Sequence, residues 1–147
     1  MTTPTIFVVT GSRDGGNWRE FVDSVLDRYF DAFGMPDTLA HGDARGVDTL
    51  AKEWAERKGI TPTPFPADWD THGTAAGPIR NSEMVNWAVA QRDHQRKVVF
   101  IAFPGSKGTA DCLRKAKRAG LMIREWRFKN GEAIEVGTPP RKQEPTR

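Results

Sequence analysis

The sequence contains one cysteine, Cys112, and three histidines in 147 residues. A single cysteine cannot form an internal disulfide, and His41, His72 and His94 lack the spacing of zinc ligands. The sequence therefore excludes a disulfide scaffold, and we expect neither a metal nor another cofactor.

Long hydrophobic runs and a strong charge of one sign are also missing. The longest apolar run, residues 98–103, is far shorter than the ~20 residues that cross a membrane. Residues 1–4 lead into a strand-like segment without a basic region, so we expect no secretory signal, no membrane partner and a cytoplasmic location. The formal net charge is only +3, which argues against a protein built to bind nucleic acid by charge alone.

Short apolar segments alternate with amphipathic ones along most of the chain. Residues 6–10, 38–41, 97–103 and 121–128 have the composition of strands, and residues 18–29, 47–55, 79–92 and 109–119 are expected to be helices. Parallel strands need crossover connections, and helices supply them. The alternation therefore predicts an α/β fold, a Rossmann-like three-layer sandwich with a mostly parallel central sheet.

The remaining segments complete a single domain over residues 1–136. Pro62 and Pro64 cannot donate to a strand ladder, so residues 60–65 are predicted to form an edge strand. Residues 66–78 are predicted to be a long polar loop, and residues 129–131 a hairpin turn. Residues 137–147, rich in proline and basic side chains, are expected to be a disordered basic tail.

Glycine-bearing turns follow the predicted strands and carry polar or charged residues. In a doubly wound sheet the carboxyl ends of the strands meet at the edge where ligands bind, and turns that start helices favour anions such as phosphate. The candidate ligand-binding residues are Gly11, Ser12, Arg13, Gly42, Asp43, Arg45, Gly46, Asp48, Trp69, Arg80, Asn81, Gly105, Ser106, Gly108 and Thr109.

Several of these residues have a second interpretation. Asp48 could serve only to complement a helix dipole, and Arg80 could form a surface salt bridge instead of binding phosphate. Trp69 could plug the edge of the core instead of stacking on a base. Because Lys107 precedes Gly108 rather than following it, the sequence excludes a Walker A motif and disfavours ATP hydrolysis.

Five short motifs stand at these turns: residues 11–13 (GSR), 41–48 (HGDARGVD), 67–69 (ADW), 76–81 (AGPIRN) with Met84, and 108–111 (GTAD). Together, over about residues 5–127, they resemble the YspA-like (cpYpsA-related) branch of the SLOG superfamily. The resemblance implies a Rossmann-like domain that binds nucleotides or nucleotide-derived small molecules. The superfamily also includes the Lonely Guy phosphoribohydrolases and the DNA-processing protein DprA, and members of this branch occur in bacteria and phages.

The Lonely Guy enzymes carry an R-K-x-x-M helix and a P-G-G-x-G-T-x-x-E loop. Arg80 and Met84 match the first motif, with Asn81 in place of lysine. In the second motif, Cys112 occupies the position of the glutamate, and Asp111 is the nearest carboxylate. The remaining matches to the loop are Pro104, Gly105, Gly108 and Thr109, with Ser106 replacing the second glycine.

The sequence and the resemblance together leave three functions open. The first is sensing or sequestration of a nucleotide or nucleotide-derived small molecule at the carboxyl ends of the strands. The second is nucleotide processing of the Lonely Guy type, with Arg80 binding phosphate and Asp111 or Asp48 acting as acid or base. The third, which is less favoured, is single-stranded DNA binding by the basic helix over residues 109–119, as in DprA. A homodimer is also open, because related SLOG proteins commonly dimerise.

Overall fold

The structure, a computed structural model, describes residues 3–137. Most of the predicted basic tail, residues 138–147, therefore lies outside the described residues. Within the described range, no helix has the length and apolar character needed to cross a membrane.

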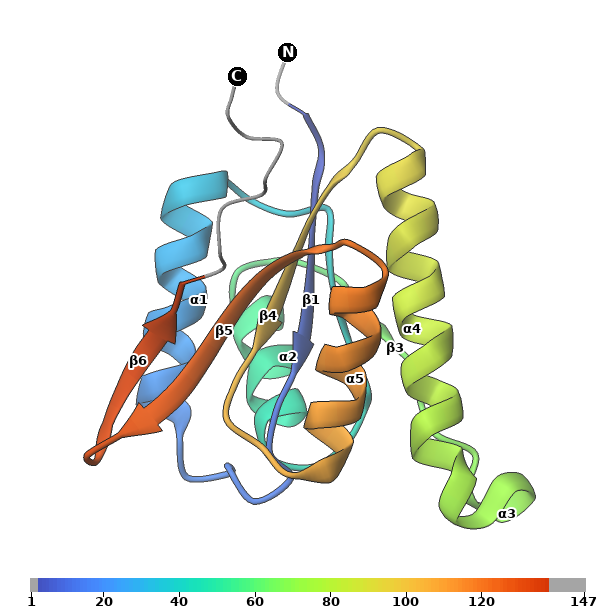
Figure 1. The fold of residues 1–147 in the computed structure, drawn as a ribbon. Helices are drawn as coiled ribbons and strands as arrows, with labels where there is room; N and C mark the ends of the chain where they lie inside the picture. Colours follow the sequence, from blue (N-terminus) through green and yellow to red (C-terminus); the bar gives the residue numbers. More distant parts are fainter. Residues whose placement is uncertain (1–2, 138–147) are drawn as a thin grey trace.

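One six-stranded sheet forms the centre of the fold, in the order β3-β2-β1-β4-β5-β6 (Figure 1). All neighbouring strands pair in parallel except β5 and β6, which form an antiparallel hairpin. The predicted α/β fold with a mostly parallel sheet is confirmed. The strands are β1 (Thr5–Thr10), β2 (Thr38–His41), β3 (Pro62–Pro64), β4 (Lys97–Ala102), β5 (Met122–Lys129) and β6 (Glu132–Val136).

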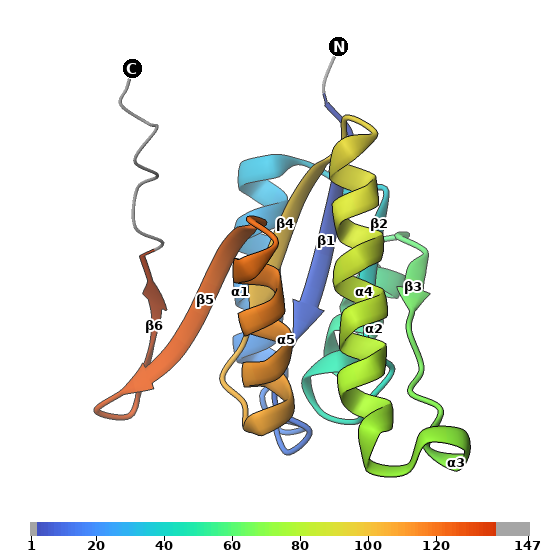
Figure 2. The same cartoon turned by 45° about the vertical axis from the view of Figure 1, so that its right-hand side comes forward.

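Helices cover both faces of this sheet. Figure 2 shows α4 and α5 on one face of the sheet, and α1 and α2 behind the strands on the other face. From β1 the strand order continues in two directions, with β2 and β3 on one side and β4, β5 and β6 on the other. Ligands bind where the strand order switches in this way, so the carboxyl ends of β1 and β4 are the expected ligand-binding edge. The helices are α1 (Arg19–Phe33), α2 (Val47–Arg57), α3 (Trp69–His72), α4 (Ala76–Asp93) and α5 (Lys107–Arg118), with a 3₁₀ turn at Gly73–Ala75.

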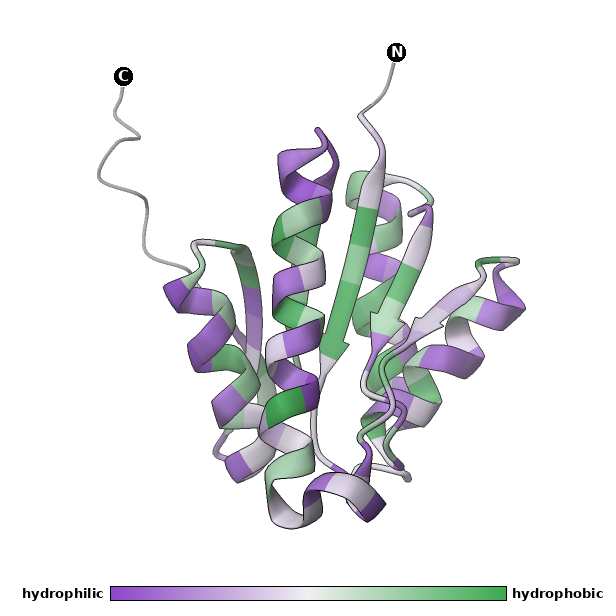
Figure 3. Ribbon diagram, turned by 90° about the vertical axis from the view of Figure 1, so that its right-hand side faces the viewer, coloured by the Kyte–Doolittle hydropathy of each residue, from purple (hydrophilic) through white to green (hydrophobic). Residues whose placement is uncertain are grey.

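Strand β1 is buried on both sides, which explains the apolar run from Ile6 to Val9 at its centre. Phe7 and Val9 belong to the core beneath α1 and α2, whereas Ile6 and Val8 belong to the core beneath α4 and α5. Figure 3 shows the same pattern, with the inner strands hydrophobic along most of their length and hydrophilic residues distributed along the helices. The two cores hold the strand ends, and therefore the turns that follow them, in fixed positions.

Two predictions about the chain between α2 and α4 had different outcomes. The prolines of β3 do lie at the sheet edge, as predicted. The loop predicted over residues 66–78 is in fact largely helical, because Asp68 caps α3 by accepting a hydrogen bond from the Thr71 N–H at 3.2 Å, and α4 begins at Ala76. Figure 1 shows α3 near the carboxyl end of the sheet, and Trp69, the first residue of α3, lines the cavity described below.

Candidate ligand-binding site

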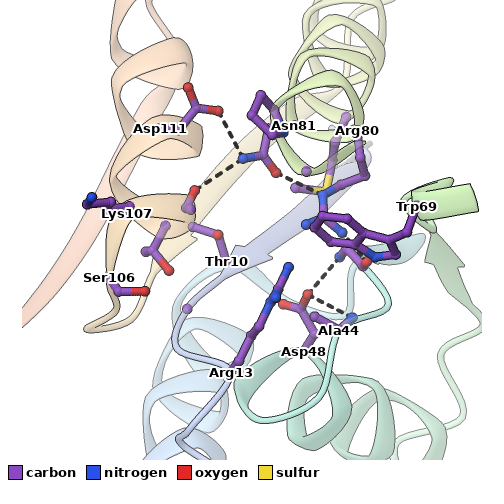
Figure 4. Close-up of a pocket in the computed structure, with 17 residues that line it drawn as sticks. Thr10, Arg13, Ala44, Asp48, Trp69, Arg80, Asn81, Ser106, Lys107 and Asp111 are labelled. Atoms are coloured by element: carbon purple, nitrogen blue, oxygen red, sulfur yellow. Dashed lines mark hydrogen bonds between the residues drawn. The ribbon is translucent and has the colours of Figure 1, made fainter. Parts of the chain in front are cut away.

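A cavity of about 450 Å³ lies at the carboxyl ends of β1, β2 and β4, which is within the usual size range of small-molecule sites. We call it the main cavity (Figure 4). Its walls come from the turns after these strands, from α3, and from the first turns of α4 and α5. Of the predicted ligand-binding residues, the lining includes Gly11, Arg13, Gly42, Asp48, Trp69, Arg80, Asn81, Ser106, Gly108 and Thr109.

Backbone hydrogen bonds through Ser12 join three of these turns. The Ser12 N–H donates to the Pro104 carbonyl at 3.0 Å, and the Ser12 carbonyl accepts from the Val47 N–H at 3.0 Å. The turns meet closely enough that a Cβ on Gly46, where φ is +82°, would lie 2.3 Å from the Ser12 oxygen. Ser12 and Gly46 therefore build the rim of the site without lining the main cavity.

The turn after β2 is one of the glycine-bearing turns expected to favour an anion, but several of its backbone N–H groups already have acceptors. One oxygen of Asp48, Oδ2, accepts from the N–H groups of Gly42 at 3.1 Å and Ala44 at 3.3 Å. The Asp43 N–H donates to Nδ1 of His41 at 3.0 Å. The turn is thus organised by its own side chains, and a ligand would meet Asp48 and the Gly42 backbone rather than an open cradle.

Asp48 is an unusual carboxylate because it is only 6% exposed. Burial raises its pKa to about 6, although the two N–H donors and the nearby Arg80 charge oppose this shift. Its second oxygen, Oδ1, is buried and has no hydrogen-bond partner among the described residues. The main cavity therefore contains one group that can change its protonation state close to neutral pH.

Arg80 lies on α4 and is only 8% exposed, so the surface salt bridge considered from the sequence is wrong. Its Nη1 donates to the Gly42 carbonyl and, at 3.5 Å, to the Phe65 carbonyl. Its Nε donates to Oδ1 of Asn81 at 2.9 Å. Among the described residues no carboxylate is within ion-pair distance of Arg80, and Nη2 has no protein acceptor.

The guanidinium of Arg80 explains why position 42 is a glycine. A Cβ at Gly42 would lie 2.5 Å from Nη1 of Arg80, so a larger residue would displace the arginine. The glycine thereby allows the backbone to approach a buried cation, whose remaining donor group is free for an anion.

Asn81 joins α4 to the start of α5. Its amide nitrogen donates to the Gly108 carbonyl at 3.1 Å and to Oδ2 of Asp111 at 3.0 Å. Burial alone would raise the pKa of Asp111, but the Asn81 and Lys115 hydrogen bonds outweigh it and leave the pKa lowered. Asp111 also pairs with Arg114 at 2.7 Å and stays ionised, which suits positioning better than proton transfer.

Cys112 replaces the glutamate of the Lonely Guy loop and faces the core instead of the cavity. It is fully buried, and burial raises its pKa to about 12. A thiol that remains protonated cannot act as a nucleophile or a base at neutral pH.

Three of the five basic side chains of α5 have a carboxylate neighbour. Lys115 pairs with Asp111 at 2.9 Å, and Lys117 pairs with Glu125 at 3.2 Å. Arg114 shares Asp111 with Lys115, so α5 keeps a net positive charge, and single-stranded DNA binding by this helix stays a prediction.

The start of α5 has backbone N–H groups that no side chain caps. Ser106 occupies the N-cap position, yet its hydroxyl makes no hydrogen bond to the first turn. Lys107 and Gly108 line the main cavity beside it. The positive end of the α5 dipole therefore faces the main cavity, which Arg80 also lines.

Trp69 and Arg13 contact each other across the mouth of the main cavity (Figure 4). The guanidinium carbon of Arg13 lies 5.0 Å from the centre of the indole ring. Because Trp69 is 46% exposed, it does not plug the core, and its indole ring lies at the cavity with Arg13 over it.

A second, adjoining cavity of about 340 Å³ opens beside this contact, and we call it the side cavity. Asp43 and Arg45 line only the side cavity, together with Pro66 and Ala67. Both cavities share the same dividing wall, which consists of Arg13, Gly42, Ala44, Trp69 and Arg80.

A sequence model described as the YspA, cpYpsA-related SLOG family matches residues 5–72. The chain is also 36% identical over 124 residues to the Gene 61 protein of Mycobacterium phage D29, an alignment that covers 79% of this chain and 91% of that protein. The chain belongs to the YspA, cpYpsA-related SLOG family. The resemblance inferred from the five motifs is confirmed.

A solved structure supports the fold of this SLOG protein. The X-ray structure of TM1055, a structural genomics target, superposes with a TM-score of 0.60 at 16% sequence identity. The match covers 81% of this chain and 72% of TM1055. At this identity the likeness shows a common fold.

The predicted site residues do not all line the main cavity. Gly105 faces a different cavity behind the α5 start, where a Cβ would collide with Thr109. Met84 and Lys107 line the main cavity although neither was singled out as a ligand-binding residue. For Met84 the available signal was its spacing one turn after Arg80, which places both side chains on one face of α4.

Proposed function

We propose that this protein binds a nucleotide or nucleotide-derived small molecule in the main cavity. The observation that carries the proposal is the buried guanidinium of Arg80. It has no carboxylate partner among the described residues and keeps an unused donor group. Arg80 lines a cavity at the carboxyl ends of β1 and β4, where the strand order switches side. Such a cation is best compensated by an anionic ligand. Membership of the SLOG family supports the same ligand class.

In this proposal the phosphate lies between Nη2 of Arg80 and the uncapped start of α5. The N–H groups after Ser106 supply the positive end of a helix dipole, and Lys107 adds a mobile positive charge. The base stacks on Trp69 at the mouth, where stacking on an aromatic ring contributes about 1–3 kcal/mol.

The test is a thermal-shift screen with AMP, GMP, CMP and UMP, followed by calorimetry on any nucleotide that stabilises the protein. A ligand at about 100 times its dissociation constant should stabilise the fold by about 2.7 kcal/mol. The absence of any shift or heat with all four nucleotides would contradict the proposal.

Gly108 offers a matched pair of variants for the phosphate position. A Cβ at Gly108 would meet no atom within 4 Å, so Gly108→Glu and Gly108→Gln both begin in open space. Glutamate in the first turn of α5 favours the helix but repels phosphate, whereas glutamine has the same size without the charge. We expect Gly108→Glu to weaken nucleotide binding at least tenfold more than Gly108→Gln. Equal affinities would place the phosphate elsewhere.

A second candidate function is hydrolysis of the bond between base and ribose, and Asp48 is the observation that favours it. Its raised pKa of about 6 suits a general acid or base, whereas the ion-paired Asp111 does not. Incubation with the same four nucleotides, with chromatography for free base, tests this function. Release that persists in Asp48→Asn would exclude Asp48 from the reaction.

A further inference from the structure

The side cavity has no occupant in the proposed function, although it shares a wall with the main cavity. Five residues line both spaces, and two of them, Arg13 and Arg80, are cations. A single ligand could therefore extend from one cavity into the other past the contact between Arg13 and Trp69. The arrangement differs from two independent sites because the same guanidinium groups face both.

The charges around the side cavity favour an anion. Arg13, Arg45 and Arg80 line it, and Asp43 is its one carboxylate among the described residues. Arg13 has no ion-pair partner in the described part of the chain. Arg45 pairs with Asp14 at 3.6 Å, but both side chains are highly exposed, and such pairs are weak.

The two cavities also differ in what they can hold. The main cavity is the larger one, and its walls include the apolar side chains of Pro78 and Met84, which suit a nucleoside. The side cavity is smaller, and three arginines line it beside Trp69, Pro66 and Ala67. The arginines suit phosphate oxygens and hydroxyl groups.

We propose that the site takes a two-part ligand, a nucleoside diphosphate whose terminal phosphate carries a polar group such as a sugar. The nucleoside lies in the main cavity with its first phosphate between Arg80 and the start of α5, as in the proposed function. The second phosphate lies at the shared wall beside Arg13, and the polar group lies in the side cavity near Arg45. This inference rests on the proposed function and adds the class of ligand.

The experiment compares AMP, GMP and UMP with ADP-ribose, GDP-mannose and UDP-glucose by calorimetry on the full chain. ADP alone tests the second phosphate without a sugar. We expect at least one diphosphate sugar to bind tenfold or more tightly than its monophosphate, with the plain diphosphate between them. Equal affinities within each pair would overturn the two-part ligand while leaving the proposed function intact. If no compound binds, both proposals fail.

Two variants alter the side cavity alone. Arg45→Ala removes one of its cations, and Ala67→Leu reduces its volume, while neither residue lines the main cavity. Both should reduce the tenfold preference to below about threefold and change the affinity for the monophosphate less than twofold. Arg118→Ala, an exposed arginine at the far end of α5, is the control for net charge. A preference that survives both side-cavity variants would overturn the inference.

Discussion

Asp48→Asn should stabilise the fold at neutral pH. Burial raises the pKa of Asp48 from 3.8 to about 6, and one pKa unit corresponds to about 1.4 kcal/mol. Ionised Asp48 therefore costs the folded state on the order of 3 kcal/mol relative to the protonated acid. Asparagine retains an oxygen for the N–H groups of Gly42 and Ala44 and carries no charge, but its amide nitrogen replaces the unpartnered Oδ1. We expect a net gain of about 1–2 kcal/mol, or roughly 3–6 °C in Tm.

The raised pKa of Asp48 also predicts how the stability of the fold changes with pH. Between about pH 4 and pH 6 the unfolded chain has released the Asp48 proton, whereas the folded chain still holds it. The contribution of Asp48 to stability therefore falls as the pH rises through this window, and it is constant above it. Because all other titrating groups are common to both proteins, the stability difference between Asp48→Asn and wild type should grow by about 2–3 kcal/mol from pH 4 to pH 7.

Urea unfolding followed by circular dichroism at pH 4.5, 5.5, 6.5 and 7.5 measures this difference. Asp31→Asn, an exposed position on α1, makes the same change of charge and should show no such growth. If Asp48→Asn is less stable than wild type at pH 7.5, or if the difference does not change with pH, then Arg80 and the N–H donors outweigh burial. The carboxylate would then be an ionised, stabilising group.

Two further predictions concern the rim of the site and the core behind it. Gly46→Ala should destabilise the fold by more than about 2 kcal/mol in urea, because φ is +82° and the new Cβ would lie 2.3 Å from the Ser12 oxygen; Gly108→Ala, in open space, should be nearly neutral. Cys112 should resist thiol reagents in the folded protein and react only after unfolding, since it is fully buried and its pKa is about 12; rapid labelling in native buffer, measured by mass spectrometry, would contradict its position.

The fold was predictable from the sequence because its main signals are local. Apolar runs such as that of β4 and the amphipathic stripe of α2 require no knowledge of the rest of the chain. The prolines of β3 likewise determine an edge position by their missing donors. Helix α3 was missed because four residues hold too little periodicity, and its cap at Asp68 could equally have indicated a turn.

The site was predictable only in outline. Glycine at a strand end indicates a turn, but sequence cannot separate Gly46, which packs against the Ser12 carbonyl, from Gly108, which borders open space. It also cannot show that Asp48 already binds the N–H groups of Gly42 and Ala44. These distinctions depend on how turns far apart in the chain approach one another.

Arg80 and Asp48 together explain why an anionic ligand should matter for stability as well as function. Arg80 is a buried cation without an ion-pair partner among the described residues, and Asp48 is a buried acid with an unpartnered oxygen. Without a compensating group, both side chains destabilise the folded state. A phosphate at Nη2 would compensate the arginine and, as a negative charge near Asp48, would raise the pKa of that acid further. Ligand binding should therefore be accompanied by proton uptake near pH 6, which calorimetry in buffers of different ionisation enthalpy would detect. Binding without proton uptake would place the phosphate away from Asp48.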